Sequence, residues 1–345
     1  MEYDFKHLFC EQPFTNLEVS ENGEIYSCCP SWLNKPLGNL QTDTIDSAWN
    51  SEAAQKIRES IHDGSFRFCN KSLCPRLNSD EMLRTKIKDS YIKRLMESHA
   101  IVLDKTVTKL NLCYDRSCNL QCPSCRLTMI FHRPGSDQWK KAKLIQEEIV
   151  KILHGVQWLK LTGSGDPFAS PLFFELLKRI DSKLFPQLKI FLHTNGLLFT
   201  PTKWNEISSA QGSISKVEIS IDAATEYTYS KLRFPGDFKL LLKNLDFISS
   251  LYKGGSIQDL KLSFVVQEEN FREIPEFVKL GKFFNVSRVY FSGLDDWSTF
   301  WRKDYLNKAV HLEGHPLQKE LIQILKRLDY QSDFIDLGNL SGLIK

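Results

Sequence analysis

The sequence has no cysteine after Cys125, no apolar run of membrane-spanning length and almost no excess of charge of either sign. Without about 18 consecutive apolar residues, the chain offers no transmembrane helix. Its opening residues lack the basic and apolar regions of a signal peptide. A net charge of +3 over 345 residues excludes a protein built to wrap nucleic acid. We therefore expect a cytoplasmic protein that partners neither membrane nor nucleic acid.

The cysteines that are present form two groups. Nine in total is an odd number, and their uneven spread does not fit a disulfide framework. In the cytoplasm thiols stay reduced, and clustered reduced thiols are typical of zinc or iron–sulfur sites. The first group comprises Cys10, Cys28, Cys29, Cys69 and Cys74, and the second comprises Cys113, Cys118, Cys122 and Cys125.

From residue 109 onward, short apolar segments alternate with amphipathic helical segments. Repeated β–α units predict an α/β fold with a parallel sheet, either doubly wound or closed into a barrel. Functional loops then gather at the carboxyl ends of the strands. We expect strands at 109–113, 156–161, 188–192, 217–221, 262–266 and 286–291, and helices at 137–154, from 170, 201–210, 237–251, 271–284 and 317–328.

Three cysteines directly after the first expected strand have C-x3-C-x2-C spacing: Cys118, Cys122 and Cys125. Structural zinc normally takes four ligands, and the nearest candidate for a fourth is His132. Three thiolates without a fourth partner suggest instead a metal centre with one open position. A short zinc loop completed by His132 is the alternative.

This spacing after a first strand resembles the signature of the radical S-adenosylmethionine (SAM) enzymes. The resemblance implies a partial (β/α)6 TIM-like barrel with a [4Fe-4S] cluster held by those three cysteines and SAM bound to its fourth iron. It implies reductive cleavage of SAM to a 5′-deoxyadenosyl radical, which takes a hydrogen atom from the substrate. It also implies a flavodoxin- or ferredoxin-type reductant.

Three further segments at strand ends resemble the same family. Residues 163–167, Gly-Ser-Gly-Asp-Pro, are similar to its Gly-Gly-Glu-Pro segment, with Ser and Asp as replacements. Residues 193–196 resemble its Thr-Asn-Gly segment, and 220–223, followed by Arg233, resemble its Ser-Leu-Asp-Gly…Arg arrangement. Taken alone, the first could be a Gly-rich turn and Arg233 a surface ion-pair partner. The SAM-binding residues implied are Gly163, Ser164, Gly165, Asp166, Asn195, Ser220 and Arg233.

One position departs from the family pattern. Many members place an aromatic residue before the third cysteine, where it packs on adenine, whereas this sequence has Ser124. We therefore expect the adenine contact to come from elsewhere, at the backbone near residues 265–267.

The first cysteine group resembles the SPASM auxiliary-cluster domain. The spacing C-x12-G-x4-C is formed by Cys10, Gly23 and Cys28. Residues 38–40 and 48–51 also match the Gly-Asn-Leu and Trp-Asn motifs of that domain. This domain usually follows the barrel, but here it precedes it and is short. The resemblance implies one auxiliary [4Fe-4S] cluster. Its ligands would be Cys10, Cys28, Cys69 and Cys74, with Cys29 as a substitute for Cys28, and a four-thiolate zinc site is the alternative.

These patterns together divide the chain into four parts. We expect an auxiliary-cluster domain at residues 1–80 and a linking helix at 81–106. The radical SAM partial barrel would occupy 107–300, and a C-terminal helical extension would pack on it at 301–345.

The substrate is the least specified feature. We expect a small molecule, sugar- or nucleotide-like and from a natural-product pathway, rather than a peptide, with the auxiliary cluster handling electron transfer. A peptide-modifying maturase and a non-catalytic, zinc-stabilised binding protein are the alternatives. Cys113, at the end of the first strand, is a candidate hydrogen-atom donor, although a free strand cysteine is more often core. Asp115 and Asp222 are carboxylates of open role at the barrel mouth.

Overall fold

A computed structural model describes residues 5–74, 76–77, 82–328 and 332–344. The chain divides into two compact units. The first unit comprises residues 1–115, 132–164 and 185–189, and the second comprises 116–131, 165–184 and 190–345. The expected boundary at residues 80 and 81 lies outside the described residues. No helix in the described part of the chain is long and apolar enough to cross a bilayer.

Among its described residues, the first unit contains five strands in the order β5-β4-β1-β2-β3. Strands β5, β4 and β1 are parallel, whereas β1, β2 and β3 pair antiparallel. The register aligns Glu18 of β1 with Asn111 of β4 and Lys160 of β5. The cysteine-rich segment thus adds three strands that the sequence did not predict. Their bounds are β1 (Asn16–Val19), β2 (Glu24–Tyr26), β3 (Gly38–Asn39), β4 (Lys109–Leu112) and β5 (Trp158–Leu161).

The helices of this unit begin at polar capping residues. Ser136 accepts a hydrogen bond from the backbone of Trp139 and starts α5, which buries Ala142 and Ile145 along its apolar stripe. The linking region contains one helix, α4. The helices are α1 (Gln12–Thr15), α2 (Ile45–Trp49), α3 (Glu52–His62), α4 (Ser90–Ser98) and α5 (Asp137–Ile152), with 3-10 turns η2 (Arg84–Lys86) and η3 (Leu153–Gly155).

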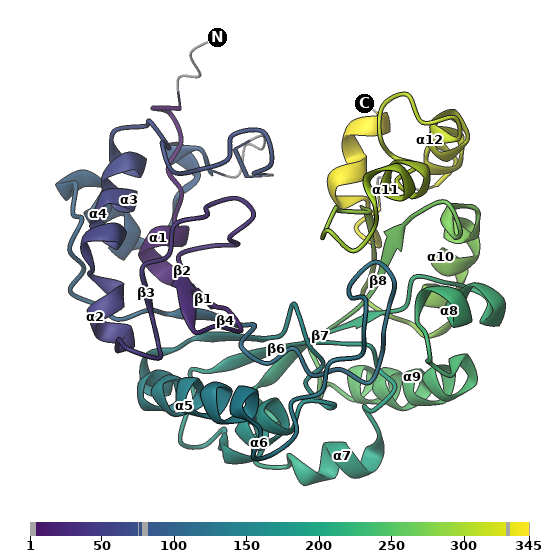
Figure 1. Ribbon diagram of the computed structural model, residues 1–345, viewed down its shortest axis with the longest axis horizontal. Helices are drawn as coiled ribbons and strands as arrows, with labels where there is room; N and C mark the ends of the chain where they lie inside the picture. Colours follow the sequence, from purple (N-terminus) through teal and green to yellow (C-terminus); the bar gives the residue numbers. More distant parts are fainter. Residues whose placement is uncertain (1–4, 75, 78–81, 329–331, 345) are drawn as a thin grey trace. The chain divides into compact units, whose positions relative to one another are not determined.

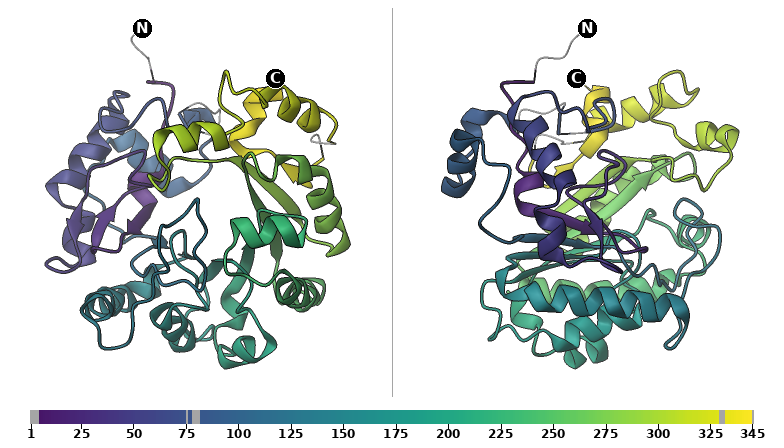
Figure 2. Two further views of the ribbon diagram at one scale, coloured as in Figure 1. Left: turned by 45° about the vertical axis from the view of Figure 1, so that its right-hand side comes forward. Right: turned by 60° about the vertical axis from the view of Figure 1, so that its left-hand side comes forward.

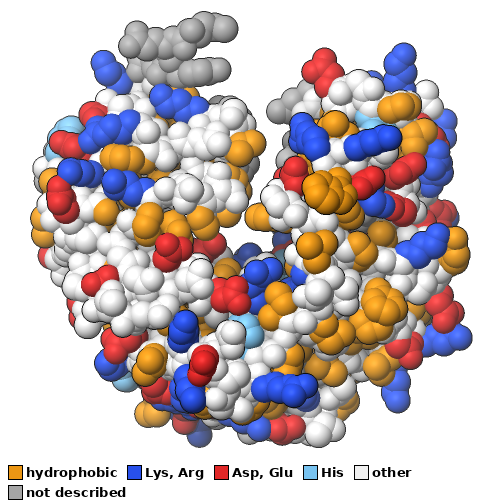
Figure 3. Space-filling view, viewed as in Figure 1, with side chains coloured by type: hydrophobic (Ala, Val, Ile, Leu, Met, Phe, Trp, Pro, Cys, Tyr) orange, Lys and Arg blue, Asp and Glu red, His pale blue; other side chains and the backbone are white. Residues whose placement is uncertain are grey.

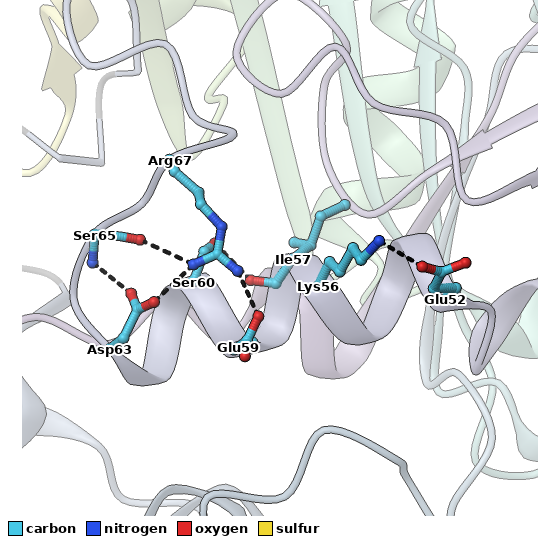
Figure 4. A network of polar contacts seen from close by, with 8 residues as sticks. All are labelled: Glu52, Lys56, Ile57, Glu59, Ser60, Asp63, Ser65 and Arg67. Carbon is cyan, nitrogen blue, oxygen red and sulfur yellow. Dashed lines mark hydrogen bonds and ion pairs between the residues drawn. The ribbon is translucent and has the colours of Figure 1, made fainter.

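Two arginines in this unit have opposite environments. Arg58 of α3 is fully buried, and its guanidinium donates to the carbonyls of Pro13, Trp49 and Ile101 over 2.6–2.9 Å. Arg67, just after α3, is exposed and forms ion pairs with Glu59 at 2.5 Å and Asp63 at 2.7 Å (Figure 4). Arg58 therefore joins three separate segments, whereas Arg67 fixes only a surface turn.

The described part of the second unit contains five parallel strands in the order β6-β7-β8-β9-β10. Along β6, buried and half-buried side chains alternate, so one face of the sheet is fully covered and the other is not. The short strand β10 was not predicted, and it pairs with β9 through Ile335 and Asp336. Their bounds are β6 (Lys189–Thr194), β7 (Ile214–Ser220), β8 (Asp259–Val266), β9 (Arg288–Gly293) and β10 (Ile335–Asp336).

Helices cover the apolar face of these strands, as Figures 1 and 2 show for α8, α9 and α10. Ser170 and Asp237 cap α6 and α9, at the residues where the sequence predicted these helices to begin. The short helix α8 was not predicted. The helices are α6 (Pro171–Arg179), α7 (Pro201–Glu206), α8 (Glu226–Leu232), α9 (Phe238–Lys253), α10 (Ile274–Phe283), α11 (Arg302–Lys308) and α12 (Gln318–Lys326), with 3-10 turns η4 (Gln211–Ser213), η5 (Phe271–Glu273) and η6 (Gly338–Ile344).

All six strands expected after residue 109 are present, with ends shifted by up to three residues. Parallel strands that alternate with helices confirm the α/β class and the β–α repeat expected of a partial barrel. Basic and acidic side chains are interspersed over the face drawn in Figure 3, in keeping with the small net charge of +3.

Candidate functional site

The three-cysteine loop, residues 116–131, lies in the second unit and is closed by its own backbone. The N–H of Cys118 donates to the carbonyl of Ile130 at 2.9 Å, and that of Cys125 donates to Cys122 at 2.9 Å. Cys118 and Cys122 are buried, whereas Cys125 is exposed. The loop therefore holds two thiols inside the unit and one at its surface.

Each thiol of this loop lies near one N–H donor, two from other segments of the second unit and one from the loop itself. Asn195 Nδ2 lies 3.7 Å from Cys118 Sγ, and Arg233 Nη1 lies 3.7 Å from Cys122 Sγ. Arg126 Nη2 lies 3.4 Å from Cys125 Sγ. N–H donors to sulfur stabilise thiolates and tune the potentials of iron–sulfur clusters. The structure thus places Asn195 beside Cys118 and Arg233 beside Cys122.

Burial opposes ionisation of these thiols in the free chain. Burial, together with the nearby carboxylate of Asp166, raises the pKa of Cys118 to about 12. Burial also raises the pKa of Cys122. Ionisation of such thiols requires bound positive charge, which a metal cluster supplies.

Arg126 was missed by the sequence analysis. It is buried, and its Nη1 donates to the carbonyl of Arg116 at 2.7 Å. The charges of Cys125, Cys118 and Cys122 raise its pKa against the opposing effect of burial. The only signal in the sequence was an arginine directly after the third cysteine.

Both carboxylate oxygens of Asp166 accept hydrogen bonds from other residues of this chain. One carboxylate oxygen accepts from the N–H groups of Phe168 at 2.9 Å and Ala169 at 3.1 Å. The other accepts from Thr194 Oγ1 at 2.6 Å and Asn195 N at 2.9 Å. Asp166 is 1% exposed, so it is placed to fix the Thr194–Asn195 turn rather than to accept from a cosubstrate ammonium group.

Arg233 forms a buried ion pair with Asp222, with Nη2 2.6 Å from Oδ2. Among the described residues, its Nε has no hydrogen-bond partner. A buried donor without a partner, beside a cluster thiol, fits the expected position of an anionic ligand group. Asp222, whose role was open, thus orients Arg233.

Backbone polar groups near residues 265–267, the expected adenine contact, already form hydrogen bonds within the chain. The N–H of Val265 donates to Asp222 Oδ1 at 2.8 Å, and the N–H of Gln267 donates to Asn270 Oδ1 at 2.8 Å. The carbonyl of Val265 accepts from Asn270 Nδ2 at 2.8 Å. These hydrogen bonds stabilise the end of β8.

Ser220, the last residue of β7, lies in a row of polar side chains from β6, β7 and β8. Its hydroxyl lies 2.8 Å from His193 Nε2 and 3.2 Å from Ser263 Oγ. Two residues earlier along these strands, Glu218 pairs with Lys261 at 2.8 Å. The face of β6, β7 and β8 that carries these side chains is therefore hydrophilic.

The Gly-rich segment spans both units. Gly163 and Ser164 belong to the first, and Gly165 belongs to the second with Asp166. Ser164 Oγ donates to the carbonyl of Cys113 at 3.2 Å. A Cβ at Gly163 would lie 3.7 Å from Cys113 Sγ, and burial raises the pKa of that thiol to about 11.

In the first unit, the four thiols predicted for the auxiliary site influence one another's pKa. Burial and then repulsion from Cys10, Cys69 and Cys74 raise the pKa of Cys28. Burial, Cys10 and Cys74 raise the pKa of Cys69 to about 12. Burial is also the main cause that raises the pKa of Cys10 to about 11, with Cys74 adding to it. Every pair in this set thus interacts electrostatically.

Cys28 lies beside Cys29, and the Cys29 thiol also contributes to its raised pKa. The Cys28 thiol lies 3.8 Å from the carbonyl oxygen of Cys29. Gly23, in the turn between β1 and β2, has a φ of +79°, and a Cβ there would come within 2.7 Å of Asn39 Oδ1. The glycine of the C-x12-G-x4-C spacing is thus required by the turn that leads to Cys28.

A single-ion site does not form in the described residues. No group of three or more His, Cys, Asp or Glu side chains there lies close enough to hold one metal ion, whereas zinc with bonds of about 2.3 Å needs its sulfurs within about 4 Å of one another. His132, the zinc alternative for the three-cysteine loop, forms ion pairs with Asp115 at 3.1 Å and Glu21 at 3.3 Å instead.

The sequence matches two known families. Residues 10–75 match the SPASM family, an iron–sulfur cluster-binding domain, and residues 115–292 match the radical SAM superfamily. No curated protein matches the sequence.

Several solved structures are similar at low identity. SuiB of Streptococcus suis, bound to its precursor peptide SuiA, is 13% identical, with 83% of this chain and 62% of that chain covered and a TM-score of 0.46. TYW1 with a lysine-pyruvate adduct is 16% identical, with 64% and 71% covered and a TM-score of 0.36. The methyltransferase TsrM of Kitasatospora setae, with cobalamin and a [4Fe-4S] cluster, is 14% identical, with 52% and 33% covered and a TM-score of 0.41.

The family matches agree with the geometry. The radical SAM match covers more than half of the chain and contains the three-cysteine loop and its donors. The SPASM match contains the four mutually interacting thiols. The chain therefore belongs to the radical SAM superfamily, with SAM and a [4Fe-4S] cluster as cofactors, and it carries a SPASM domain for auxiliary iron–sulfur binding.

Proposed function

We propose that this protein is a cytoplasmic enzyme that cleaves SAM reductively and abstracts hydrogen from a polar small molecule, sugar- or nucleotide-like, in a biosynthetic pathway. When bound, the cluster and SAM supply the radical chemistry. The chain's own residues hold these cofactors, orient the substrate and exclude water.

The observation that carries the proposal is the set of three N–H donors on the three loop thiols. Asn195, Arg233 and Arg126 come from three separate segments and meet three different sulfurs. A structural loop has no need of such a set. An anionic sulfur cluster does, because each N–H offsets negative charge on a sulfur in a buried site.

For SAM itself, we propose two kinds of contact. Arg233, oriented by Asp222, would bind the carboxylate through its fork, together with the hydroxyl of Ser220. Gly163, Ser164 and Gly165 would approach the ammonium group with their backbone. Asp166 and Asn195 would then act by holding the turns around this site.

The polar strand faces support a hydrophilic substrate. The interior of a TIM barrel is normally filled with Val, Ile and Leu, yet β7 and β8 present Glu218 and Lys261 there, with Lys261 4.4 Å from the ring centre of Tyr290 on β9. In the first unit, Asn111 donates to Glu18 at 2.7 Å. Charged and amide groups of this kind suit hydroxyl-bearing or phosphorylated ligands.

We propose that Cys113 donates a hydrogen atom to the substrate radical. Its half-buried side chain lies at the end of β4, beside Gly163. Conversion of the normal substrate by a Cys113→Ala enzyme to the same product would remove this role.

For the auxiliary site, we propose one [4Fe-4S] cluster held by Cys10, Cys28, Cys69 and Cys74. Four thiolates leave no iron open, so its role would be to transfer an electron rather than to bind substrate. The half-buried position of Cys10, Cys28 and Cys69 allows such transfer without a ligand exchange.

The test is anaerobic reconstitution followed by assay of 5′-deoxyadenosine from SAM under dithionite. We expect a brown protein that releases 5′-deoxyadenosine, with release lost in Cys122→Ala and kept in Cys29→Ala. A colourless protein that binds zinc would overturn the proposal and support the binding-protein alternative. Deuterium transfer into 5′-deoxyadenosine from a labelled peptide, but from no nucleotide sugar, would instead support a peptide maturase.

A further inference from the structure

The segment that follows β8 sends two side chains back to the part of the chain that carries Arg233. The first, Asn270, is 1% exposed. Its Nδ2 donates to the carbonyls of Asp222 at 2.9 Å and Val265 at 2.8 Å, and its Oδ1 accepts from the N–H of Gln267 at 2.8 Å. Both the nitrogen and the oxygen of this buried amide are therefore used within the chain. Asn270 thus joins the end of β8 to the residues just after β7.

Asp222 has a backbone conformation that needs such support. Its φ is +60°, in the left-handed region that is uncommon for residues other than glycine. In this conformation its Oδ1 accepts from the N–H of Val265 at 2.8 Å, and its Oδ2 lies 2.6 Å from Nη2 of Arg233. The hydrogen bond from Asn270 to the Asp222 carbonyl therefore fixes the turn that directs this carboxylate toward Arg233.

The second side chain, Glu273 at the end of η5, holds the start of α8. Its Oε2 accepts from the N–H groups of Ala224 at 2.6 Å and Thr225 at 3.2 Å. Its Oε1 accepts from the hydroxyls of Thr225 at 2.7 Å and Thr228 at 2.5 Å. The turn η5 leads directly into α10, which lies next to α8 in Figure 1. Because Arg233 directly follows α8, Glu273 fixes the helix from which Arg233 extends.

The orientation of Arg233 depends on both ends of the 222–233 segment. Its Nη2 pairs with Asp222, and its Nη1 lies 3.7 Å from Cys122 Sγ. Its Nε has no partner among the described residues and is left for a ligand. A guanidinium is planar and rigid, so a rotation that breaks one of these contacts also moves the nitrogen that is left for the ligand.

We propose that Asn270 and Glu273 are positioning residues that hold Arg233 in the orientation that binds the SAM carboxylate. This inference rests on the proposed function, in which Arg233 makes that contact. Each of the two residues acts through the 222–233 segment rather than by touching SAM. A change at either residue should therefore weaken SAM binding and leave cluster uptake intact.

The experiment measures the Kd of SAM by equilibrium dialysis against the anaerobically reconstituted protein, together with the iron content and Tm of every variant. For Asn270→Ser we expect SAM binding to weaken about tenfold. For Glu273→Gln we expect about threefold, because glutamine keeps one accepting oxygen. Decarboxylated SAM lacks the group that Arg233 binds, so it should bind these variants as it binds the parent protein.

Arg233→Met shows whether the two residues act through Arg233. Alone, this change should weaken SAM binding by at least about tenfold. Adding Asn270→Ser to it should weaken binding no further, because residues that act through one contact are not additive. Additive losses in the double variant would overturn the inference.

Two matched controls separate positioning from stability. In the first unit, Asn50 donates through Nδ2 to the carbonyl of Leu103 at 3.0 Å and accepts through Oδ1 from its N–H at 2.9 Å. Asn50→Ser should therefore lower Tm without changing the Kd of SAM. Glu276, three residues after Glu273, is exposed on α10 and pairs with Lys279. Glu276→Gln should change neither quantity.

Two further results would overturn the inference while leaving the proposed function intact. One is a parent-like Kd of SAM in Asn270→Ser and Glu273→Gln when Arg233→Met weakens binding. The other is an equal weakening for SAM and decarboxylated SAM. If Asn270→Ser takes up no iron, Glu273→Gln, alone and combined with Arg233→Met, decides the question. An Arg233→Met protein that binds SAM as the parent does would instead refute the proposed contact between Arg233 and SAM.

Discussion

Nδ1 of His132 lies 3.1 Å from Oδ1 of Asp115, so the two residues that flank the three-cysteine loop form an ion pair. Nε2 of His132 also lies 3.3 Å from Oε1 of Glu21, in the turn after β1. Asp115 is fully buried, and these two carboxylates raise the pKa of His132 to about 9. A protonated His132 thus joins the two ends of the three-cysteine loop through its ion pair with Asp115.

The first prediction concerns the pH dependence of this closure. Because the folded pKa of about 9 exceeds the ordinary histidine pKa of 6.5, the ion pairs stabilise the fold fully below about pH 6.5. Their contribution falls as the pH rises through 9. We expect His132→Gln to lower Tm by several degrees at pH 6 and by almost nothing at pH 9.5. An equal loss at both pH values would show that packing, not charge, stabilises this position.

The second prediction concerns Arg126. Its positive charge beside Cys125 favours the reduced, more negative form of the loop cluster. Arg126→Gln should lower the reduction potential by about 60 mV, the equivalent of a tenfold change for one electron, and Arg126→Lys should lower it by less. A redox titration followed by EPR measures this, with Arg133→Gln as an exposed control. An unchanged potential in Arg126→Gln, with iron content intact, would rule out a tuning role.

The third prediction decides the auxiliary ligand set. Two [4Fe-4S] clusters correspond to about eight iron atoms per chain. We expect Cys28→Ala to retain about four and Cys29→Ala to retain about eight, because Cys28 interacts with all three other thiols of the set. Iron analysis after anaerobic reconstitution measures both. The reverse outcome would make Cys29 the ligand.

The fourth prediction contrasts two arginines near α3. Arg58→Met leaves the carbonyls of Pro13, Trp49 and Ile101 without their donor, and we expect a loss of about 3 kcal/mol in the free energy of unfolding. Arg67→Gln removes only exposed ion pairs, which are worth about 0–1 kcal/mol. Urea unfolding of the two variants, compared with the unaltered protein, tests the difference. Equal losses would contradict the structural role of Arg58.

Much of the second unit was predictable because its signals are local. Apolar segments of strand length identified β6 to β9, and Ser170 and Asp237 identified the starts of α6 and α9. The cysteine spacings likewise indicated both thiol sets, because ligands of one cluster must lie close together in a loop or recur at fixed intervals.

What could not be predicted depends on partners distant in sequence. Asp166 has its four acceptor positions filled by Phe168, Ala169, Thr194 and Asn195, and two of these come from another strand end. The strand β1 has only four residues and exists because β4 pairs with it. No periodicity within either segment reveals such partners.

The parallel pairing of β1 with β4 has a consequence for attempts to divide this protein. If the cysteine-rich segment were removed before β4, the backbone of Lys109 to Leu112 would become a bare sheet edge, open to pairing with other chains. Such a truncated chain would aggregate rather than fold as a smaller enzyme. The auxiliary segment is therefore not an exchangeable accessory here, and grafting it onto another barrel would require transplanting β4 with it.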